Sequence, residues 1–224
     1  MSVIEESGEA MFERMCSALG LEAKRIPESA AQRQKSPDFE VVGLDGTAFH
    51  AEVKTVSPSP EEAEYIQAVY RGEVRVSGGT PGDRMRELIA KANKQLKAVA
   101  DHGWPGTLVV FNPELLLKWH TEAYSILTAM RGLDVVDVTV PLDPGVPPSF
   151  GPLRAGPRKR MTADANTTTA AIVCPREISS GNWEVDVYHN RHAARVLPFA
   201  ALDHLCVRQW VLTADHEFVK APGR

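Results

Sequence analysis

Hydrophobic positions along the chain change repeatedly between helical and strand spacing. In residues 3–20 and 83–101 the apolar side chains recur every three or four positions, which predicts amphipathic helices. A further helix is expected to begin near Pro60, where proline suits a first helical turn, and another to span 113–130. The core-facing positions of the first two helices are Ile4, Met11, Phe12, Met15 and Leu19, and Met85, Leu88, Ala92, Leu96 and Val99. Ser2 and Gly20 are the expected caps of the first helix, and Asp83 of the second.

Apolar or alternating runs between these helices predict strands. The expected strands are residues 39–42, 47–56, 107–112, 135–140, 168–174 and 183–189, with a hairpin turn between the last two. Residues 205–212 fit either a further strand or a short helix. Because strands alternate with helices, the predicted fold class is α/β, with a sheet flanked by helices.

Residues 36–56 are predicted to form a hairpin around which the rest of the chain is organised. Leu44-Asp45-Gly46 fits a three-residue loop whose glycine takes a left-handed conformation. The strands then pair so that Asp38 lies opposite Glu52, with the two Cβ atoms about 5 Å apart. Lys54 shares the face of Glu52, since strand side chains alternate with period two. A two-residue loop would break this register, so the prediction depends on the turn type.

The composition narrows the class of protein. Hydrophobic residues make up 43% of the 224, which predicts a sizeable core. No apolar run reaches the length of a membrane span, and the acidic start is unlike a secretory signal, so we expect a cytoplasmic protein without membrane contact. The formal net charge of −4 means that nucleic acid binding would need a local basic cluster. Free buried thiols are favoured over disulfides or a zinc site for the three widely spaced cysteines, Cys16, Cys174 and Cys206.

A dense basic run occurs within residues 141–166, a Pro/Gly-rich segment that is expected to be a long loop. Two interpretations stay open for it, a solvated surface loop and a nucleic-acid-binding loop. In the second interpretation the contacting residues are Arg154, Arg158, Lys159 and Arg160.

The converging hairpin residues have the chemistry of a metal-dependent phosphodiester hydrolysis centre. Mg²⁺ prefers one or two carboxylates and keeps several waters, which suits Asp38 and Glu52, with the carbonyl of Val53 as a third candidate ligand. Lys54 would orient or deprotonate the attacking water, or neutralise charge on the phosphate. Glu9 lies at the flank of the apolar stripe of helix 3–20, nearer the core than the other acids of that helix, although a solvated charge is the simpler interpretation of Glu9 alone.

A purely structural interpretation also exists for the same residues. Asp38 would cap a turn, and Glu52 with Lys54 would form an ion pair on a wet sheet face.

The pattern resembles the PD-(D/E)XK nuclease superfamily, whose fold is that of restriction endonucleases. Pro37-Asp38 matches the first element of its motif, and Glu52-Val53-Lys54 matches the second. Glu9 matches an acidic residue on the first helix of that family, and Gln95 a glutamine on the helix that follows the second element. The order helix, strand, strand, helix, strand over residues 3–112 also matches, so the resemblance covers about half of the chain.

This resemblance implies a restriction endonuclease-like core with a central mixed β-sheet of about four strands flanked by helices, and a C-terminal β-rich extension. The expected organisation is a single domain over 1–224, with a core of about 1–140, the loop 141–166 and C-terminal strands in 167–224. The C-terminal half carries no functional motif, and three roles stay open for it: completing the sheet, carrying specificity, or forming a homodimer.

The implied function is Mg²⁺- or Mn²⁺-dependent hydrolysis of phosphodiester bonds, with DNA as the favoured substrate. In that role Asp38, Glu52 and Val53 hold the metal, Lys54 assists the water, and Glu9 and Gln95 support the site. Two alternatives keep the fold. One is an RNA-cutting, toxin-like nuclease, and the other is a non-catalytic module that binds nucleic acid or protein.

Overall fold

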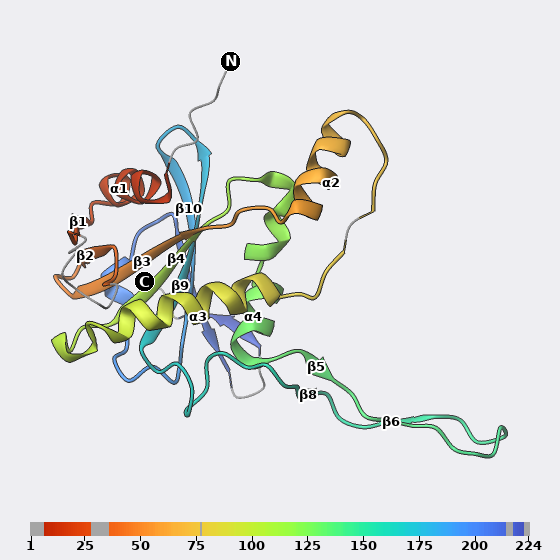
Figure 1. Ribbon diagram of the computed structural model, residues 1–224. Helices are drawn as coiled ribbons and strands as arrows, with labels where there is room; N and C mark the ends of the chain where they lie inside the picture. The colour runs from red at the N-terminus through yellow and green to blue at the C-terminus, as the bar shows by residue number, and fades with distance from the viewer. Residues whose placement is uncertain (1–6, 28–35, 77, 214–216, 222–224) are drawn as a thin grey trace.

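The computed structural model describes residues 7–27, 36–76, 78–213 and 217–221, and shows an α/β fold built on a mixed sheet of eight strands (Figure 1). The sheet pairs its strands in the order β1–β2–β3–β4–β9–β10–β11–β12, and three of the seven pairings, β3–β4, β4–β9 and β10–β11, are parallel. The strand bounds are β1 (Glu22–Arg25), β2 (Phe39–Val42), β3 (Ala48–Thr55), β4 (Gly106–Phe111), β9 (Thr169–Ser179), β10 (Asn182–His189), β11 (Val207–Leu212) and β12 (Phe218–Lys220). The predicted α/β class is therefore confirmed, with more strands than expected.

Helices cover both faces of this sheet, and each face has its own hydrophobic core. One core lies between the sheet and α1 (Gly8–Leu19), and includes Phe12, Phe39 and Phe49. The other lies under α3 (Asp83–Lys97) and α4 (Ala123–Arg131). Because β3 alternates its side chains, Phe49, Ala51 and Val53 enter the α1 core while the residues between them face α3.

The helix ends follow their capping chemistry. The Ser7 hydroxyl accepts a hydrogen bond from Ala10 at the start of α1, and Gly20 ends the helix at φ 72°. The expected cap Ser2 and the core position Ile4 lie outside the described residues. The helix expected near Pro60 is α2 (Pro60–Tyr70), which begins with a capping box between Ser59 and Glu62.

Two other helix predictions need correction at their ends. Asp83 does not cap α3, because Gly82 occupies the N-cap position, and the helix stops at Lys97 before a short 3₁₀ turn, η1 (Ala100–His102). The predicted helix 113–130 is divided into η2 (Leu115–Thr121) and α4, because Glu122 between them has an extended backbone.

The predicted strand 135–140 is wrong as a member of the main sheet, and the predicted loop 141–166 is only partly a loop. Residues 132–156 form a two-stranded ribbon, here called the arm, which extends away from the body of the protein (Figure 1). Its strands are β5 (Asp134–Val135), β6 (Val138–Thr139), β7 (Ser149–Phe150) and β8 (Arg154–Ala155). Of the predicted strand 135–140, only Val135, Val138 and Thr139 lie in strands, and their partner strands come from the arm itself.

The C-terminal strands continue the main sheet. The parallel pairing of β9 with β4 joins residues 169–173 to the N-terminal strands, and β10 follows β9 through a turn in which Gly181 has φ 76°. Residues 207–212 are a strand, which decides between the two predicted alternatives. All three cysteines are free, as expected, and two of them are buried.

The hairpin that carries the candidate site has the predicted register. Phe39 pairs with Ala51, and Val41 with Phe49. The amide of Gly46 donates to the carbonyl of Gly43, and Gly46 has φ 82°, as a three-residue loop closed by glycine requires. The prediction from turn chemistry is therefore confirmed.

The C-terminal half supports this hairpin directly. A Cβ atom on Gly43 would lie 2.7 Å from the carbonyl oxygen of Ala201, in the short helix η3 (Phe199–Leu202), and the amide of Leu44 donates to that same oxygen.

Gly43→Ala is expected to lower the free energy of unfolding by about 1–3 kcal/mol, because the backbone must move to admit the methyl group. Urea denaturation would measure the change beside Gly78→Ala, whose added Cβ meets nothing within 4 Å. Equal stability of the two variants would contradict this contact.

Candidate active site

Strand β3 places Glu52 and Lys54 on the sheet face that α3 covers. Glu52 is fully buried, and its Oε1 atom contacts the Lys54 ammonium, which is 25% exposed. The other carboxylate oxygen, Oε2, is buried without a hydrogen-bond partner among the described residues. A buried carboxylate oxygen without a donor is unfavourable unless a cation or proton satisfies it.

Asp38 lies immediately before β2, where the pairing between β2 and β3 ends. Its amide donates to the carbonyl of Ala51 (3.1 Å), and its Oδ2 atom accepts a hydrogen bond from the amide of Val53 (2.7 Å). The Asp38 carboxylate thus accepts the hydrogen bond that a backbone carbonyl would accept if the β2–β3 pairing continued. Since the backbone groups of Ala51 and Val53 point the same way, the Val53 carbonyl is directed toward the Asp38 side of β3.

Burial alters the acidity of both carboxyl groups. Desolvation, together with the nearby charge of Asp38, raises the pKa of Glu52 to about 7, and Lys54 and the Gln95 side chain on α3 limit the rise. Burial also raises the pKa of Asp38, against the lowering effects of the Val53 amide and Lys54. Two close carboxyl groups with raised pKa values form a site that favours a proton or a cation.

Glu9 approaches the site from α1, on the opposite face of the sheet from Gln95. Its carboxylate lies 3.6 Å from the guanidinium of Arg25, and its charge raises the pKa of Asp38. Among the described residues, no three His, Cys, Asp or Glu side chains gather at metal-binding separation. Glu9 is therefore near Asp38 without forming a ligand cluster with Asp38 and Glu52.

The structure thus brings Asp38, Glu52, Lys54 and Gln95 together, with Glu9 beside them. Asp38, Glu52 and the Val53 carbonyl form an oxygen donor set of the kind that Mg²⁺ takes, with waters completing the coordination. The unpartnered Oε2 of Glu52 fits this use.

Of the four residues of the predicted basic run, two form ion pairs with aspartates and two are exposed. Arg154 forms a bidentate ion pair with Asp137 on the arm, and Arg158 contacts Asp83 at 2.9 Å. Lys159 and Arg160 are exposed. Nucleic acid binding by the first two would compete with these ion pairs.

Three exposed lysines on α3 were not chosen from the sequence as site residues. Lys91 lies one turn before Gln95 on the same side of the helix, with Lys94 and Lys97 beside it. No ion pair involves these lysines within the parts of the chain that are described. The sequence signal that could have identified them is their spacing of three residues along the helix that also carries Gln95.

His50 lies two residues before Glu52 on the same face of β3 and borders the carboxylates. It is buried, its Nε2 atom lies 3.4 Å from Nδ1 of His102, and the ring of Trp104 packs on it. Desolvation lowers the pKa of His50. These contacts give His50 a packing role between β3 and the segment of η1 and Trp104 that precedes β4.

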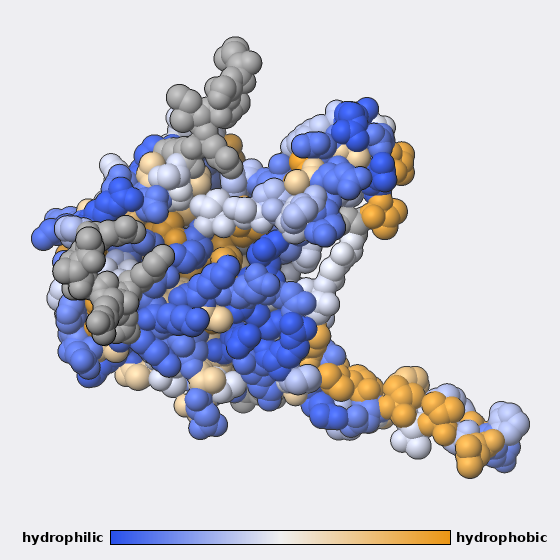
Figure 2. All heavy atoms as spheres, in the orientation of Figure 1, coloured by the Kyte–Doolittle hydropathy of each residue, from blue (hydrophilic) through white to orange (hydrophobic). Residues whose placement is uncertain are grey.

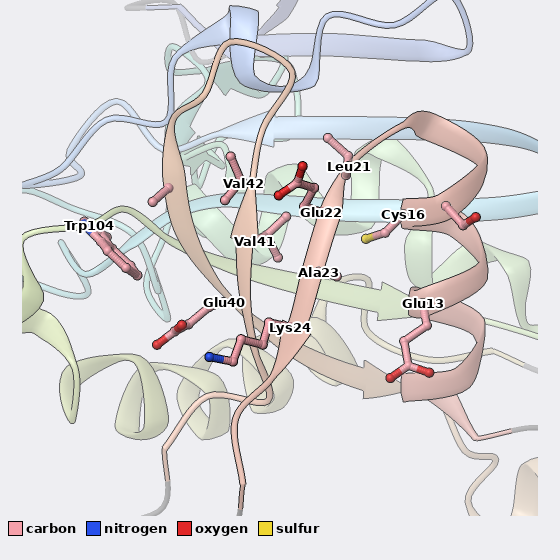
Figure 3. A pocket seen from close by; sticks show the side chains of 12 residues that line it. Glu13, Cys16, Leu21, Glu22, Ala23, Lys24, Glu40, Val41, Val42 and Trp104 are labelled. Atoms are coloured by element: carbon pink, nitrogen blue, oxygen red, sulfur yellow. The ribbon is translucent and has the colours of Figure 1, made fainter.

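A separate cavity of about 610 Å³ opens at the β1–β2 edge of the sheet (Figure 3). Side chains from α1, β1 and β2 line it together with Trp104, and two of its charged residues, Lys24 and Glu40, lie opposite each other in the β1–β2 register. Asp38, Glu52 and Lys54 do not line this cavity.

Comparison of the chain with protein-family models, with curated proteins and with solved structures found no match. The described helices include none that is both long enough and apolar enough to cross a bilayer.

The burial of Glu52 predicts a pH-dependent stability in metal-free protein. The folded state holds the Glu52 proton up to about pH 7, whereas the ordinary pKa is 4.5. The stabilising contribution of the protonated group is therefore complete below about pH 4.5 and is lost as the pH rises through about 7. Glu52→Gln removes this titration, so it should gain stability relative to wild type across that range. Urea denaturation in a chelating buffer would show this, and parallel pH profiles would contradict it.

Proposed function

We propose that the protein is a metal-dependent nuclease that hydrolyses phosphodiester bonds, with DNA as the favoured substrate. The observation that carries the proposal is the convergence of Asp38 and Glu52 at the end of the β2–β3 pairing, with a buried Glu52 oxygen that lacks a hydrogen-bond partner among the described residues. The β2–β3 pairing fixes the positions of Asp38 and Glu52 relative to each other, as a catalytic centre requires.

The residues that would hold the ion are Asp38, Glu52 and the carbonyl of Val53. A bound Mg²⁺ or Mn²⁺ supplies charge stabilisation at the phosphate and lowers the pKa of water. The chain contributes a fixed donor set, since Asp38 is held through the Val53 amide and Glu52 by its burial in the sheet. The oxygen atoms available for coordination are Oε2 of Glu52 and the Asp38 oxygen that does not accept the Val53 hydrogen bond.

Lys54 is the side chain best placed to act on the attacking water or on the phosphate. It reaches the carboxylate of Glu52 while a quarter of its surface stays open to solvent. An ammonium in that position can orient a water by hydrogen bonding or stabilise negative charge that develops on phosphate oxygens. Gln95 would contact the same region from α3, and Glu9 would affect it through the charge of Asp38.

The arrangement of elements around the hairpin also supports the proposal. Helix α1 precedes the antiparallel strands β1, β2 and β3, and α3 precedes β4, which runs parallel to β3. This contains the order helix, strand, strand, helix, strand that the resemblance to PD-(D/E)XK nucleases implies. A restriction endonuclease-like core is therefore part of the proposal.

The exposed lysines of α3 are the surface that we propose for the substrate backbone. Lys91, Lys94 and Lys97 face solvent on the helix that carries Gln95, and phosphate contacts need such cations. The space-filling view shows a continuous hydrophilic surface over this part of the molecule (Figure 2). This surface accords better with the proposal than Arg154, whose charge is matched by Asp137.

Incubation with plasmid, linear duplex, single-stranded DNA and structured RNA, in Mg²⁺, Mn²⁺ or chelator, tests the function. Cleavage of DNA that requires the metal is the expected result. Cleavage confined to RNA would favour the RNA-cutting alternative. Retained binding to nucleic acid, with no metal binding by calorimetry and no cleavage, would favour the non-catalytic module.

A further inference from the structure

The arm exposes an unusual amount of apolar side chain for a segment that leaves the body of the protein. Figure 2 shows the projecting ribbon as hydrophobic along much of its length. Val138 is 50% exposed, Val140 is 70% exposed and Phe150 is 73% exposed, while Leu142 near the tip is fully exposed. Contiguous apolar surface of this extent marks an interaction site.

These side chains are arranged on one face of the ribbon. Val138 pairs directly with Phe150, so both point to the same side. Val136 and Val140 lie two positions before and after Val138, just outside β6, and an extended chain directs them to that side as well. Thr139 pairs with Ser149 on the other side. Apolar and polar side chains therefore alternate along the ribbon as in a strand with one buried face. No other segment of the described chain covers the apolar face, which stays exposed.

The base of the arm is built to hold the ribbon in one place. The amide of Gly156 donates to the carbonyl of Leu133, and Gly132 approaches the backbone of Gly156 so closely that a Cβ atom would lie 2.5 Å from its oxygen. Arg158, just beyond the base, contacts Asp83 at the start of α3. Five prolines between residues 132 and 156 further restrict the chain, which reduces the entropy that ordering on binding would remove.

We propose that the apolar face of the arm packs against the same face of a second copy of this chain, which makes the protein a homodimer. An isolated two-stranded ribbon is marginal in water, whereas two amphipathic ribbons packed face to face form a two-layered unit with a buried apolar interior. The face carries no charge, so a symmetric contact buries no unpaired ion. Counted over the whole arm, with Leu142, Val146 and Leu153 included, the exposed apolar residues present a surface on the order of 800 Å², which is what one partner contributes to a standard interface.

The charges of the arm argue against nucleic acid as the occupant. Residues 132–156 contain three aspartates and one arginine, and that arginine is paired with Asp137. Such a segment repels phosphate and offers no free cation to it. The dimer proposal is independent of the nuclease activity, because it uses none of the residues of the candidate active site.

The experiment compares oligomeric state by sedimentation velocity and light scattering across a wide concentration range. Wild type is expected to be a dimer. Val138→Asp combined with Phe150→Asp should raise the dimer dissociation constant at least about 100-fold, because each copy would place two carboxylates in the apolar contact. Thr139→Asp combined with Ser149→Asp is the matched control on the opposite face, and it should remain dimeric.

Circular dichroism and thermal unfolding of each variant show whether the body is folded, and the arm lies outside both hydrophobic cores. A second measurement uses Phe150→Cys with a short bifunctional maleimide, which should give a covalent dimer. A monomeric wild type would overturn the proposal. So would a dimer that survives the two apolar-face substitutions, or one that the control substitutions disrupt equally.

Discussion

Asp38→Asn is expected to reduce metal-dependent DNA cleavage by about 10³-fold, because a neutral amide oxygen replaces a charged metal ligand. Loss of several kcal/mol of electrostatic stabilisation corresponds to a reduction of this size. The asparagine oxygen can still accept the hydrogen bond from the Val53 amide, so the hairpin should keep its register. The expected loss therefore reports on charge at the site and not on folding.

The matched control for this substitution is Asp45→Asn, in the turn of the same hairpin. Its Oδ1 atom accepts a hydrogen bond from the amide of Thr47, and an asparagine oxygen can do the same. Activity of Asp45→Asn should stay within a few-fold of wild type.

Lys54→Met, like Asp38→Asn, should lose cleavage activity, but it should retain binding of Mn²⁺, since Lys54 is not a ligand. Equal cleavage by Asp38→Asn, Lys54→Met and wild type would refute the assignment of this centre.

Arg86→Met is expected to produce the largest loss of stability, about 3 kcal/mol in the free energy of unfolding. Arg86 is 2% exposed, and its guanidinium donates to the carbonyls of Thr128 and Pro81 as well as to Asp83. Methionine fills most of the volume, but it removes the Arg86 donor to the Pro81 carbonyl and to Asp83, and leaves the Thr128 carbonyl with the Gly132 amide alone, which is costly in a buried place. Urea denaturation would measure the change.

Lys97→Met is the control for Arg86→Met on the same helix, because Lys97 is exposed there. Its effect should stay within about 0.5 kcal/mol. A similarly small effect of Arg86→Met would show that water satisfies the Thr128 and Pro81 carbonyls once the guanidinium is removed. Since Asp83 also contacts Arg158, the Arg86 variant should loosen the base of the arm as well.

The hairpin was predictable because its turn chemistry is local. Gly46 is suited to the left-handed position, and that one conformation fixes which residues pair across the strands. The positions of Glu52 and Lys54 on one face follow from strand alternation alone. The detailed place of Asp38 did not follow, because its hydrogen bond to the Val53 amide arises only where the β2–β3 pairing stops.

Features that depend on distant parts of the chain were not predictable. The parallel pairing of β9 with β4 joins segments separated by more than fifty residues, so the sheet is larger than the local pattern indicated. Residues 135–140 have the alternation of a buried strand, and no rule of sequence reveals that the strand leaves the body. The division of helix 113–130 at Glu122 similarly reflects tertiary packing, because no proline or glycine marks it.

The hydrogen bond between the Val53 amide and Asp38 offers a spectroscopic signal from the candidate site. This amide points away from β4, so the Asp38 carboxylate is its acceptor and not a neighbouring strand. Its proton chemical shift and its rate of exchange with deuterium should therefore follow the charge on a single side chain. A titration with divalent cations, followed by nuclear magnetic resonance at this one backbone position, would register occupancy of the site without any substrate being present.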